Sequence, residues 1–250
     1  MRILLSNDDG IQSEGFSVLE RVARALSEDV WVCAPSSEQS GAGHSLTLHR
    51  PLRLEQVGDK RFTCDGTPTD CVLLAMHHVM KDNPPDLLLS GVNHGCNIAE
   101  DVTYSGTIAA AMEGTLLGVR SLALSQHYRS GQPLDFGPAT QWAGQVVNKA
   151  IAVGWAPDVL LNINFPAYET NQVKGVKVVS QWPSKAGDHL EERIDPRGRS
   201  YFWIGHSHSS SGAPEDTDLV ALRDGFVTVT PIHMDMTHYD LLDPLRAALA

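Results

Sequence analysis

The sequence has few cysteines, and their spacing matches no common metal or redox motif. Only four of the 250 residues are cysteine, namely Cys33, Cys64, Cys71 and Cys96. No two of them form a Cys-x-x-Cys pair, which excludes a zinc ribbon and a thioredoxin-like redox motif. We therefore expect four reduced thiols, mostly in or near the core.

The sequence also lacks long hydrophobic runs. No apolar stretch reaches the length that spans a membrane, and no positively charged leader precedes an apolar segment. We therefore expect a cytoplasmic protein with no membrane partner. Apolar residues make up 42% of the chain and charged residues 20%, which is typical of a globular protein.

Positive charge is scarce as well. The chain has 19 Lys and Arg residues against 30 Asp and Glu residues, for a formal net charge of −11. Affinity for nucleic acid comes largely from neutralised phosphates, so a long nucleic acid is not an expected partner. A small anionic ligand would need a local positive centre, either a metal ion or a helix N-terminus.

Residues 1–166 alternate between strand-like and helix-like runs. "RILLSN", "VWVCAP", "DLLLSG", "RSLALSQ" and "VLLNINFP" read as strands. The intervening runs "GFSVLERVARAL", "TPTDCVLLAMHHVM", "SGTIAAAMEGTLLG" and "GPATQWAGQVVNKAIAVG" favour helices. This alternation predicts an α/β fold with a Rossmann-like, doubly wound and mostly parallel sheet.

Residues 167–250 have a different pattern. The β-rich runs "KGVKVVSQW", "SYFWIG" and "GFVTVTPI" are separated by a long polar stretch, and "YDLLDPLRAALA" favours a terminal helix. We expect an antiparallel β-hairpin extension that reaches toward a partner subunit. The chain then divides into a catalytic core, 1–166, and an oligomerisation extension, 167–250, that form one structural unit. The segment "HSHSSSG", 206–212, is interpreted as a loop, and its role stays open.

Three loops that follow predicted parallel strands are rich in oxygen ligands and glycine. They are "SNDDG", "SSEQSGAGHS" and "SGVNHGCN". The carboxyl ends of parallel strands meet at one edge of a sheet, so the three loops are expected to converge there. Asp8 and Asp9 by themselves are also consistent with a solvated Asp-Gly turn. Two crowded carboxylates repel each other unless a cation or a proton lies between them.

Neutral oxygens near the two aspartates favour a metal site. Ser40 and Asn93 lie in the neighbouring loops, and Mg²⁺, Mn²⁺ and Ca²⁺ all accept mixed carboxylate, amide and hydroxyl oxygens. The residue types do not distinguish among these three cations. A divalent ion held in this way could bind a phosphate oxygen and polarise phosphorus.

Other residues could contact a phosphate. Gly91 and Gly95 suit a close approach of the backbone, although loops between strands and helices often need glycine. Ser105 and Thr107 precede an alanine-rich helix, where they could act as ordinary N-caps or help to bind phosphate. His44 and His94 flank the site, but no role is assigned to either.

Seven blocks of this sequence resemble the SurE family in order and spacing. They are "RILLSNDDG", "APSSEQSGAGHSLTL", "GTPTDCV", "SGVNHGCN", "YSGTIAAAMEG", "LNINFP" and "DTDLVALRDGFVTVTPI", and they span nearly the whole chain. The family, known as survival or stationary-phase protein E, consists of metal-dependent phosphatases of nucleoside monophosphates.

The resemblance implies a Rossmann-like core with a C-terminal hairpin and tail exchanged between subunits of a homodimer or homotetramer. It implies one divalent ion per subunit, held by Asp8, Asp9, Ser40 and Asn93. It also implies that Asn97, Ser105 and Thr107 line the phosphate pocket. Two departures, "SEG" at 13–15 and "PEDTD" at 214–218, leave the shape of the pocket mouth and the base preference open.

The function that these observations favour is hydrolysis of nucleoside 5'- or 3'-monophosphates by a 5'-nucleotidase-type phosphatase. Asp8 and Asp9 are the expected catalytic residues. The expected phosphate and substrate contacts are Asn7, Gly41, Gly91, Gly95, Asn97, Ser105, Gly106 and Thr107. We favour water over an aspartate as nucleophile, because a carboxylate that already binds a cation is a poorer nucleophile. The alternatives are a non-catalytic nucleotide-binding module and a metal-dependent transferase acting on a nucleotide diphosphate.

Overall fold

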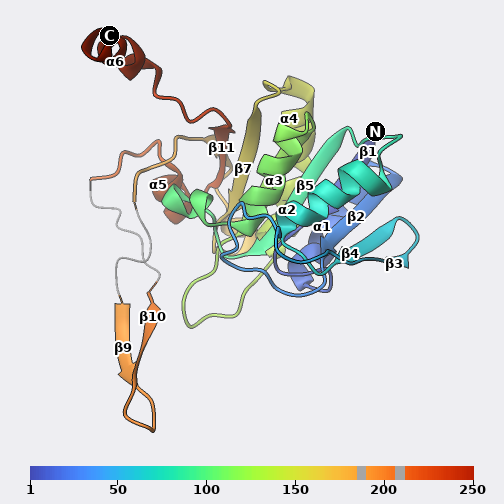
Figure 1. Ribbon diagram of the computed structural model, residues 1–250, viewed down its shortest axis with the longest axis horizontal. Coiled ribbons are helices and arrows are strands. Elements are labelled where there is room, and N and C mark those ends of the chain that lie inside the picture. The colour runs from blue at the N-terminus through green and yellow to red at the C-terminus, as the bar shows by residue number, and fades with distance from the viewer. Residues whose placement is uncertain (185–189, 206–211) are drawn as a thin grey trace.

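The computed structural model describes residues 1–184, 190–205 and 212–250 (Figure 1). Within these ranges, nine strands form one sheet in the order β3-β4-β2-β1-β5-β6-β7-β11-β8, and β9 and β10 form a separate hairpin. The strands are β1 (Arg2–Ser6), β2 (Asp29–Pro35), β3 (Leu54–Gly58), β4 (Arg61–Cys64), β5 (Leu87–His94), β6 (Arg120–Gln126), β7 (Val159–Phe165), β8 (Val176–Val178), β9 (Leu190–Ile194), β10 (Ser200–Ile204) and β11 (Val227–His233).

Helices cover both faces of the sheet (Figure 1). They are α1 (Glu14–Leu26), α2 (Pro68–Leu74), which continues as a π-helical turn over Ala75–Val79, α3 (Gly106–Leu116), α4 (Gly137–Val153), α5 (Asp218–Arg223) and α6 (Leu242–Leu249). Alternating strand residues supply the two cores. Ile3 and Leu5 belong to the same buried cluster as residues of α1 and α4, whereas Leu4 clusters with residues of α2 and α3.

The centre of the sheet is parallel from β4 through β2, β1, β5 and β6 to β7. At its two margins, β3 pairs antiparallel with β4, and β11 pairs antiparallel with β7. This arrangement confirms the predicted doubly wound, mostly parallel α/β fold. All four cysteines are free thiols, and Cys33, Cys64 and Cys71 are buried, as expected.

Local signals explain where the helices begin. The hydroxyl of Ser13 accepts from Phe16 N at 3.3 Å and caps α1. Thr67 and Asp70 form a capping box at the start of α2, with Pro68 in the first turn. Such caps satisfy backbone N–H groups that have no partner within the helix.

The C-terminal part divides between the sheet and two projecting elements. The antiparallel pair β9–β10 and the terminal helix α6 reach away from the sheet (Figure 1), as expected of an extension. The other two β-rich runs behave differently, because β8 and β11 complete the central sheet, with β8 parallel to β11. Strand β9 lies inside the long polar stretch that separates the β-rich runs of the sequence. All five of its residues are exposed, so no buried face gave its sequence an alternating pattern.

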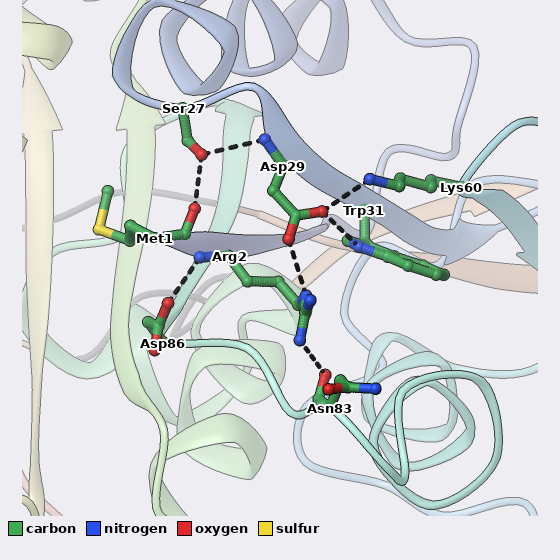
Figure 2. A network of polar contacts seen from close by, with 8 residues as sticks. All are labelled: Met1, Arg2, Ser27, Asp29, Trp31, Lys60, Asn83 and Asp86. Atoms are coloured by element: carbon green, nitrogen blue, oxygen red, sulfur yellow. Dashed lines mark hydrogen bonds and ion pairs between the residues drawn. The ribbon is translucent and has the colours of Figure 1, made fainter.

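Opposite the carboxyl ends of the parallel strands, a charged network joins the strand starts (Figure 2). Arg2 Nε contacts Asp29 Oδ2 at 2.9 Å, and Lys60 Nζ contacts Asp29 Oδ1 at 2.8 Å. Trp31 Nε1 also donates to Asp29 Oδ1, at 2.9 Å. Asp86 Oδ2 accepts from the backbone nitrogen of Arg2, which ties the start of β5 to β1.

The described part of the chain contains no helix that is both long enough and apolar enough to cross a membrane. The segment 206–212 falls outside the described residues except for Gly212, so the interpretation of 206–211 as a loop is not addressed.

Candidate active site

The expected site residues gather where the order of the parallel strands reverses. Chain order runs outward from β1 to β2 on one side, and β5 follows on the other side of β1. The crevice at the carboxyl ends of two such strands is the usual ligand site of open α/β sheets. Asp8 and Asp9 follow β1 directly, and Asn93 lies at the end of β5.

Asp8 is packed tightly against the start of α3. Its side chain is 4% exposed, and its Oδ1 accepts a short hydrogen bond from the hydroxyl of Thr107. A Cβ atom at Gly106 would lie 2.7 Å from Asp8 Cβ, so this position has no room for a side chain. Gly106 therefore permits the close approach of helix and carboxylate, and Thr107 orients the carboxylate.

Asp9 lies nearer the surface and is held by the last residue of β5. Its Oδ2 accepts from the backbone nitrogen of His94 at 3.0 Å. Within residues 1–184, 190–205 and 212–250, neither Asp8 nor Asp9 forms an ion pair with a lysine or arginine. Of the described side chains, the His94 ring offsets part of the negative charge of Asp9.

The pKa values of both carboxyl groups are raised. Burial raises the pKa of Asp8 to about 7, and the charge of Asp9 adds to the rise, while the Thr107 hydroxyl opposes it. Burial also raises the pKa of Asp9, against the opposing hydrogen bond from His94 N. Shifts of this kind, caused by desolvation and a like charge in a crevice, are typical of functional carboxylates.

Asn7 builds the turn that presents the two carboxylates. Its Nδ2 donates to Gly10 O at 2.9 Å and to Ser13 Oγ at 3.1 Å, linking the turn to the cap of α1. Gly10 has φ +92°, which favours glycine. The Oδ1 of Asn7 is buried and has no partner among the described residues. An oxygen without a donor, directly before two carboxylates in the chain, favours binding of a cation at this turn.

The loop with Ser40 and Gly41 reaches this site through its backbone. Gln39 N donates to the carbonyl oxygen of Asp8 at 2.8 Å, and Gly43 N donates to Tyr104 O at 3.0 Å. Ser40 itself is exposed, and its hydroxyl donates to Glu38 Oε1 at 2.9 Å. Gly41 has φ +74° and an open surrounding. Backbone contacts thus bring Ser40 beside Asp8 and leave its hydroxyl near solvent.

The end of β5 and the loop that follows it contribute Asn93 and the two expected glycines, with Gly91 and Asn93 in the strand and Gly95 just after it. A Cβ atom at Gly91 would lie 2.2 Å from Leu124 O, so only glycine fits there. Asn93 Nδ2 donates to Gly95 O at 2.9 Å. Because the amide nitrogen is used within the loop, the amide oxygen is the atom left for a cation. Gly95 N in turn donates to Gln126 O at the end of β6, at 3.0 Å.

Asn97 is held by a buried network that sequence reasoning missed. Its backbone nitrogen donates to Asn164 Oδ1 at 2.7 Å, and its carbonyl oxygen accepts from Asn162 Nδ2 at 2.7 Å and from Asn164 Nδ2 at 3.1 Å. Its own Nδ2 donates to Ser125 Oγ at 2.8 Å. The spacing of two asparagines inside the apolar strand "LLNINF" was the available signal, since it places both on one face of β7.

Residues of the C-terminal part also hold this loop. Ala99 N donates to Asp218 Oδ2 at 2.8 Å, and Ala99 O accepts from Gln181 Nε2 at 2.7 Å. Asp218 is fully buried and belongs to α5. The segment expected to serve association therefore also supports the site.

The start of α3 uses both of its expected hydroxyls within the protein. Ser105 Oγ accepts from Ile108 N at 3.1 Å and caps the helix, and Thr107 binds Asp8. The N-cap interpretation of Ser105 is therefore correct, and contact of either residue with phosphate stays a prediction. The positive end of the helix macrodipole faces the Asp8 side of the site.

The donors assembled here suit a hard cation. The described residues contain no group of three or more His, Cys, Asp or Glu side chains arranged to hold a metal ion. A cation at this site would bind to two carboxylates and neutral oxygens, which is the donor set preferred by Mg²⁺, Mn²⁺ and Ca²⁺ rather than by Zn²⁺.

The other histidines and tryptophans are only partly explained. His44 Nε2 contacts Glu113 Oε2 at 2.8 Å and so ties the Ser40 loop to α3. Trp182 packs beside a small buried cluster, and Trp203 is exposed on β10. His206 and His208 lie outside the described residues.

Comparisons with known proteins show which family this sequence and fold resemble. Residues 3–188 match the family model described as survival protein SurE. A protein of Paramagnetospirillum magneticum named 5'-nucleotidase SurE is 50% identical over 99% of this chain and 95% of its own length. A 5'-nucleotidase SurE of Rhizorhabdus wittichii is 53% identical over 97% of each chain. The crystal structure of the SurE protein from Aquifex aeolicus superposes with a TM-score of 0.88, at 37% identity and full coverage of both chains.

Proposed function

The chain belongs to the SurE family, and from this premise we propose that it is a divalent-metal-dependent phosphatase of nucleoside monophosphates. Its relatives are named 5'-nucleotidases, which favours the 5'-monophosphates as substrates. Hydrolysis of 3'-monophosphates is the second activity that the family resemblance implies. The products are the nucleoside and inorganic phosphate.

One observation carries the proposal. Two adjacent carboxylates lie at the switch point of the sheet without an ion pair to lysine or arginine among the described residues, and burial raises the pKa of both. A phosphate-binding module without a metal would gain nothing from two such carboxylates, since they repel its ligand. In the proposed function, Asp8, Asp9, Ser40 and Asn93 hold the cation. When bound, that cation would neutralise the carboxylates and polarise the phosphoryl group.

The remaining residues position the phosphate. Asn97 lies in a rigid loop, because both its backbone polar groups are bound by β7. The first turn of α3, with Ser105, Gly106 and Thr107, lies at the positive end of the helix, where a phosphate would be favoured. Asn7, Gly41, Gly91 and Gly95 shape the three loops so that their backbones approach this point closely. Together these groups would orient the substrate and stabilise negative charge on the transferred phosphoryl group.

Phosphate release from a panel of nucleoside monophosphates tests the proposal. We expect release in Mg²⁺ or Mn²⁺, loss of release with EDTA, and recovery when metal is restored.

Asp8→Asn should lower kcat/KM at least about a thousandfold, whereas Asp29→Asn, on the opposite edge of the sheet, should leave it unchanged. Phosphate release by the folded wild-type protein that EDTA does not affect would contradict the metal assignment. No release with any metal would refute the phosphatase.

We further propose that the projecting elements bind a second copy of the chain, giving a homodimer or homotetramer. Tyr201, Phe202, Trp203 and Ile204 on β10 are between 41% and 76% exposed, and Leu245 and Leu249 of α6 are 51% and 82% exposed. Exposed apolar residues in such number mark an association surface. Light scattering should report a dimer or tetramer. Truncation of the chain before α6 should reduce the number of subunits in this assembly. A monomeric wild-type protein would contradict this assignment.

A further inference from the structure

Two exposed tyrosines lie at the carboxyl edge of the sheet, and the site described above uses neither ring. Tyr128 follows the end of β6, next to β5, and its side chain is 42% exposed. Tyr104 comes just before the cap of α3 and is 52% exposed. A single exposed tyrosine is ordinary, so only its contacts can indicate a function.

The contacts of Tyr128 place it against the loop that carries Asn93. Its ring centroid lies 4.9 Å from that of His94, with the two planes at 65° in an edge-on arrangement. Tyr128 Cε1 is 3.7 Å from the point where a Cβ of Gly95 would lie, and Asn93 Nδ2 is 3.9 Å from the same point. The tyrosine ring and the expected metal ligand therefore flank the same glycine.

The same loop connects Tyr128 to the carboxylates. The backbone nitrogen of His94 binds Asp9 Oδ2 at 3.0 Å, while the His94 ring packs on Tyr128. Gly95 N binds Gln126 O, two residues before Tyr128. The contacts of His94 and Gly95 thus hold the Tyr128 ring in position relative to Asp9. Part of the ring remains exposed to solvent.

We propose that the Tyr128 ring, supported by His94, is the surface on which the base of a bound nucleoside monophosphate stacks. This inference rests on the proposed function, because it needs the phosphate to lie beside Asp9 and Asn93. With the phosphate at that point, the base lies farther out along the sheet edge, where Tyr128 is the aromatic ring packed on the loop. A neutral π-surface suits a base, which carries no charge for this acidic protein to repel.

Stacking on one ring has a consequence for specificity. Every base has a π-face, so a stacking platform tolerates all four bases and favours those with the larger surface. The inferred order is therefore purine over pyrimidine monophosphates, without strict selection of one base. A sugar phosphate that lacks a base should gain nothing from Tyr128.

Kinetics on matched substrates test this inference. Wild type, Tyr128→Ala, Tyr128→Phe and Tyr104→Ala are assayed with adenosine 5'-monophosphate and with ribose 5-phosphate, which shares the phosphate and sugar but has no base. Tyr128→Ala should raise KM for the nucleotide about tenfold and leave KM for ribose 5-phosphate within about twofold. Tyr128→Phe keeps the ring and should restore the wild-type KM. Tyr104→Ala should change both KM values by the same factor.

A binding measurement separates this inference from the phosphatase assignment. Calorimetric titration with adenosine, which has a base and no phosphate, should give a Kd about tenfold weaker for Tyr128→Ala than for wild type. In the kinetic assay, the inference is overturned if Tyr128→Ala changes KM for both substrates equally or for neither. In the titration, it is overturned if Tyr128→Ala binds adenosine with the wild-type Kd, or if wild type binds no adenosine. A wild-type protein that hydrolyses neither substrate but loses adenosine affinity in Tyr128→Ala would refute the phosphatase and retain the stacking site.

Discussion

The pKa values of aspartates at the two edges of the central sheet are shifted in opposite directions. At the amino edge, the hydrogen bond from Lys60 lowers the pKa of Asp29, with further contributions from Trp31 and Arg2 (Figure 2). At the carboxyl edge, burial raises the pKa of Asp8 to about 7, and its immediate neighbour is a second aspartate. The same residue type is therefore stabilised as an anion at one edge and destabilised at the other.

This difference separates structural from functional charge. Asp29 is neutralised by the chain itself, so its contacts contribute to folding and need no ligand. Thr107 and His94 offset only part of the electrostatic cost of burying Asp8 and Asp9, and a bound cation would lower that cost further. Carboxylates with perturbed acidity in a crevice mark a site more reliably than carboxylates in ion pairs do.

The largest expected effect concerns Asp8 and pH. Its folded pKa of about 7 exceeds its ordinary value of 3.8, so the folded metal-free protein retains an extra proton between these values. The free energy of unfolding should therefore fall as pH rises from about 4 to about 7, by at most about 4 kcal/mol. Urea unfolding in EDTA at pH 4 and pH 8 measures this change. Asp8→Asn should remove it, and an equal pH dependence in the variant would break the comparison between the edges.

The neutral network at the same edge gives the next effect. In the wild-type protein, Asn164 Nδ2 donates to Asn97 O and to Asn162 Oδ1. Asn164→Asp keeps the oxygen that accepts from Asn97 N, but it replaces this donor nitrogen by a second oxygen. A buried donor replaced by a charged acceptor should cost about 3 kcal/mol of unfolding free energy. The measurement is urea unfolding at pH 7, with KM for nucleotide rising in parallel. Unchanged stability and KM would show that β7 does not hold the Asn97 loop.

Asp29→Ala tests the amino edge. It removes two ion pairs and the hydrogen bond from Trp31, all partly exposed, and should cost about 1–2 kcal/mol. The pKa of Asp29 in the folded protein lies below its ordinary value of 3.8. The stabilisation by these contacts is therefore present above pH 3.8 and is lost as pH falls through the folded-state pKa. Thermal unfolding at pH 7 and pH 3 should show the difference narrowing in acid. Lys60→Met, which removes one partner, should have a smaller effect, and catalysis should be unaffected in both.

The smallest expected effect is a gain in stability from a substitution at Thr230. Thr230 is 2% exposed, lies opposite Asn162 in the sheet, and its hydroxyl has no hydrogen-bond partner among the described residues. Thr230→Val replaces this hydroxyl by a methyl group and should raise the free energy of unfolding by up to about 1 kcal/mol. Urea unfolding measures the gain. A loss of more than about 1 kcal/mol would indicate that the hydroxyl belongs to the asparagine network.

Local patterns in the chain predicted the parallel strands β1, β2, β5, β6 and β7 of the first 166 residues, but they missed β3 and β4 at one side of the sheet. Strand-like and helix-like runs alternate there, and the caps at Ser13 and Thr67 lie where the helices begin. The convergence of Asp8, Asp9 and Asn93 followed from the rule that parallel strands end at one edge. These predictions needed only information within short segments and one general rule of topology.

The contacts that complete the site could not be predicted in this way. Thr107 and Asp8 are 99 residues apart, Asn164 and Asn97 are 67 apart, and Asp218 and Ala99 are 119 apart. Each depends on the register and neighbours of distant strands, which no local pattern records. The placement of β11 beside β7 likewise depended on which sheet edge remained open.

The sequence by itself thus determined the elements, the parallel sheet and the acidic turn after the first strand, because backbone preferences and hydrophobic periodicity act over a few residues. Only the tertiary structure decided how far each carboxylate is buried and which groups face it, since burial is a property of packing between segments far apart in the chain. The acidity of Asp8 belongs to the second class, and so does the position of Tyr128 beside the Asn93 loop.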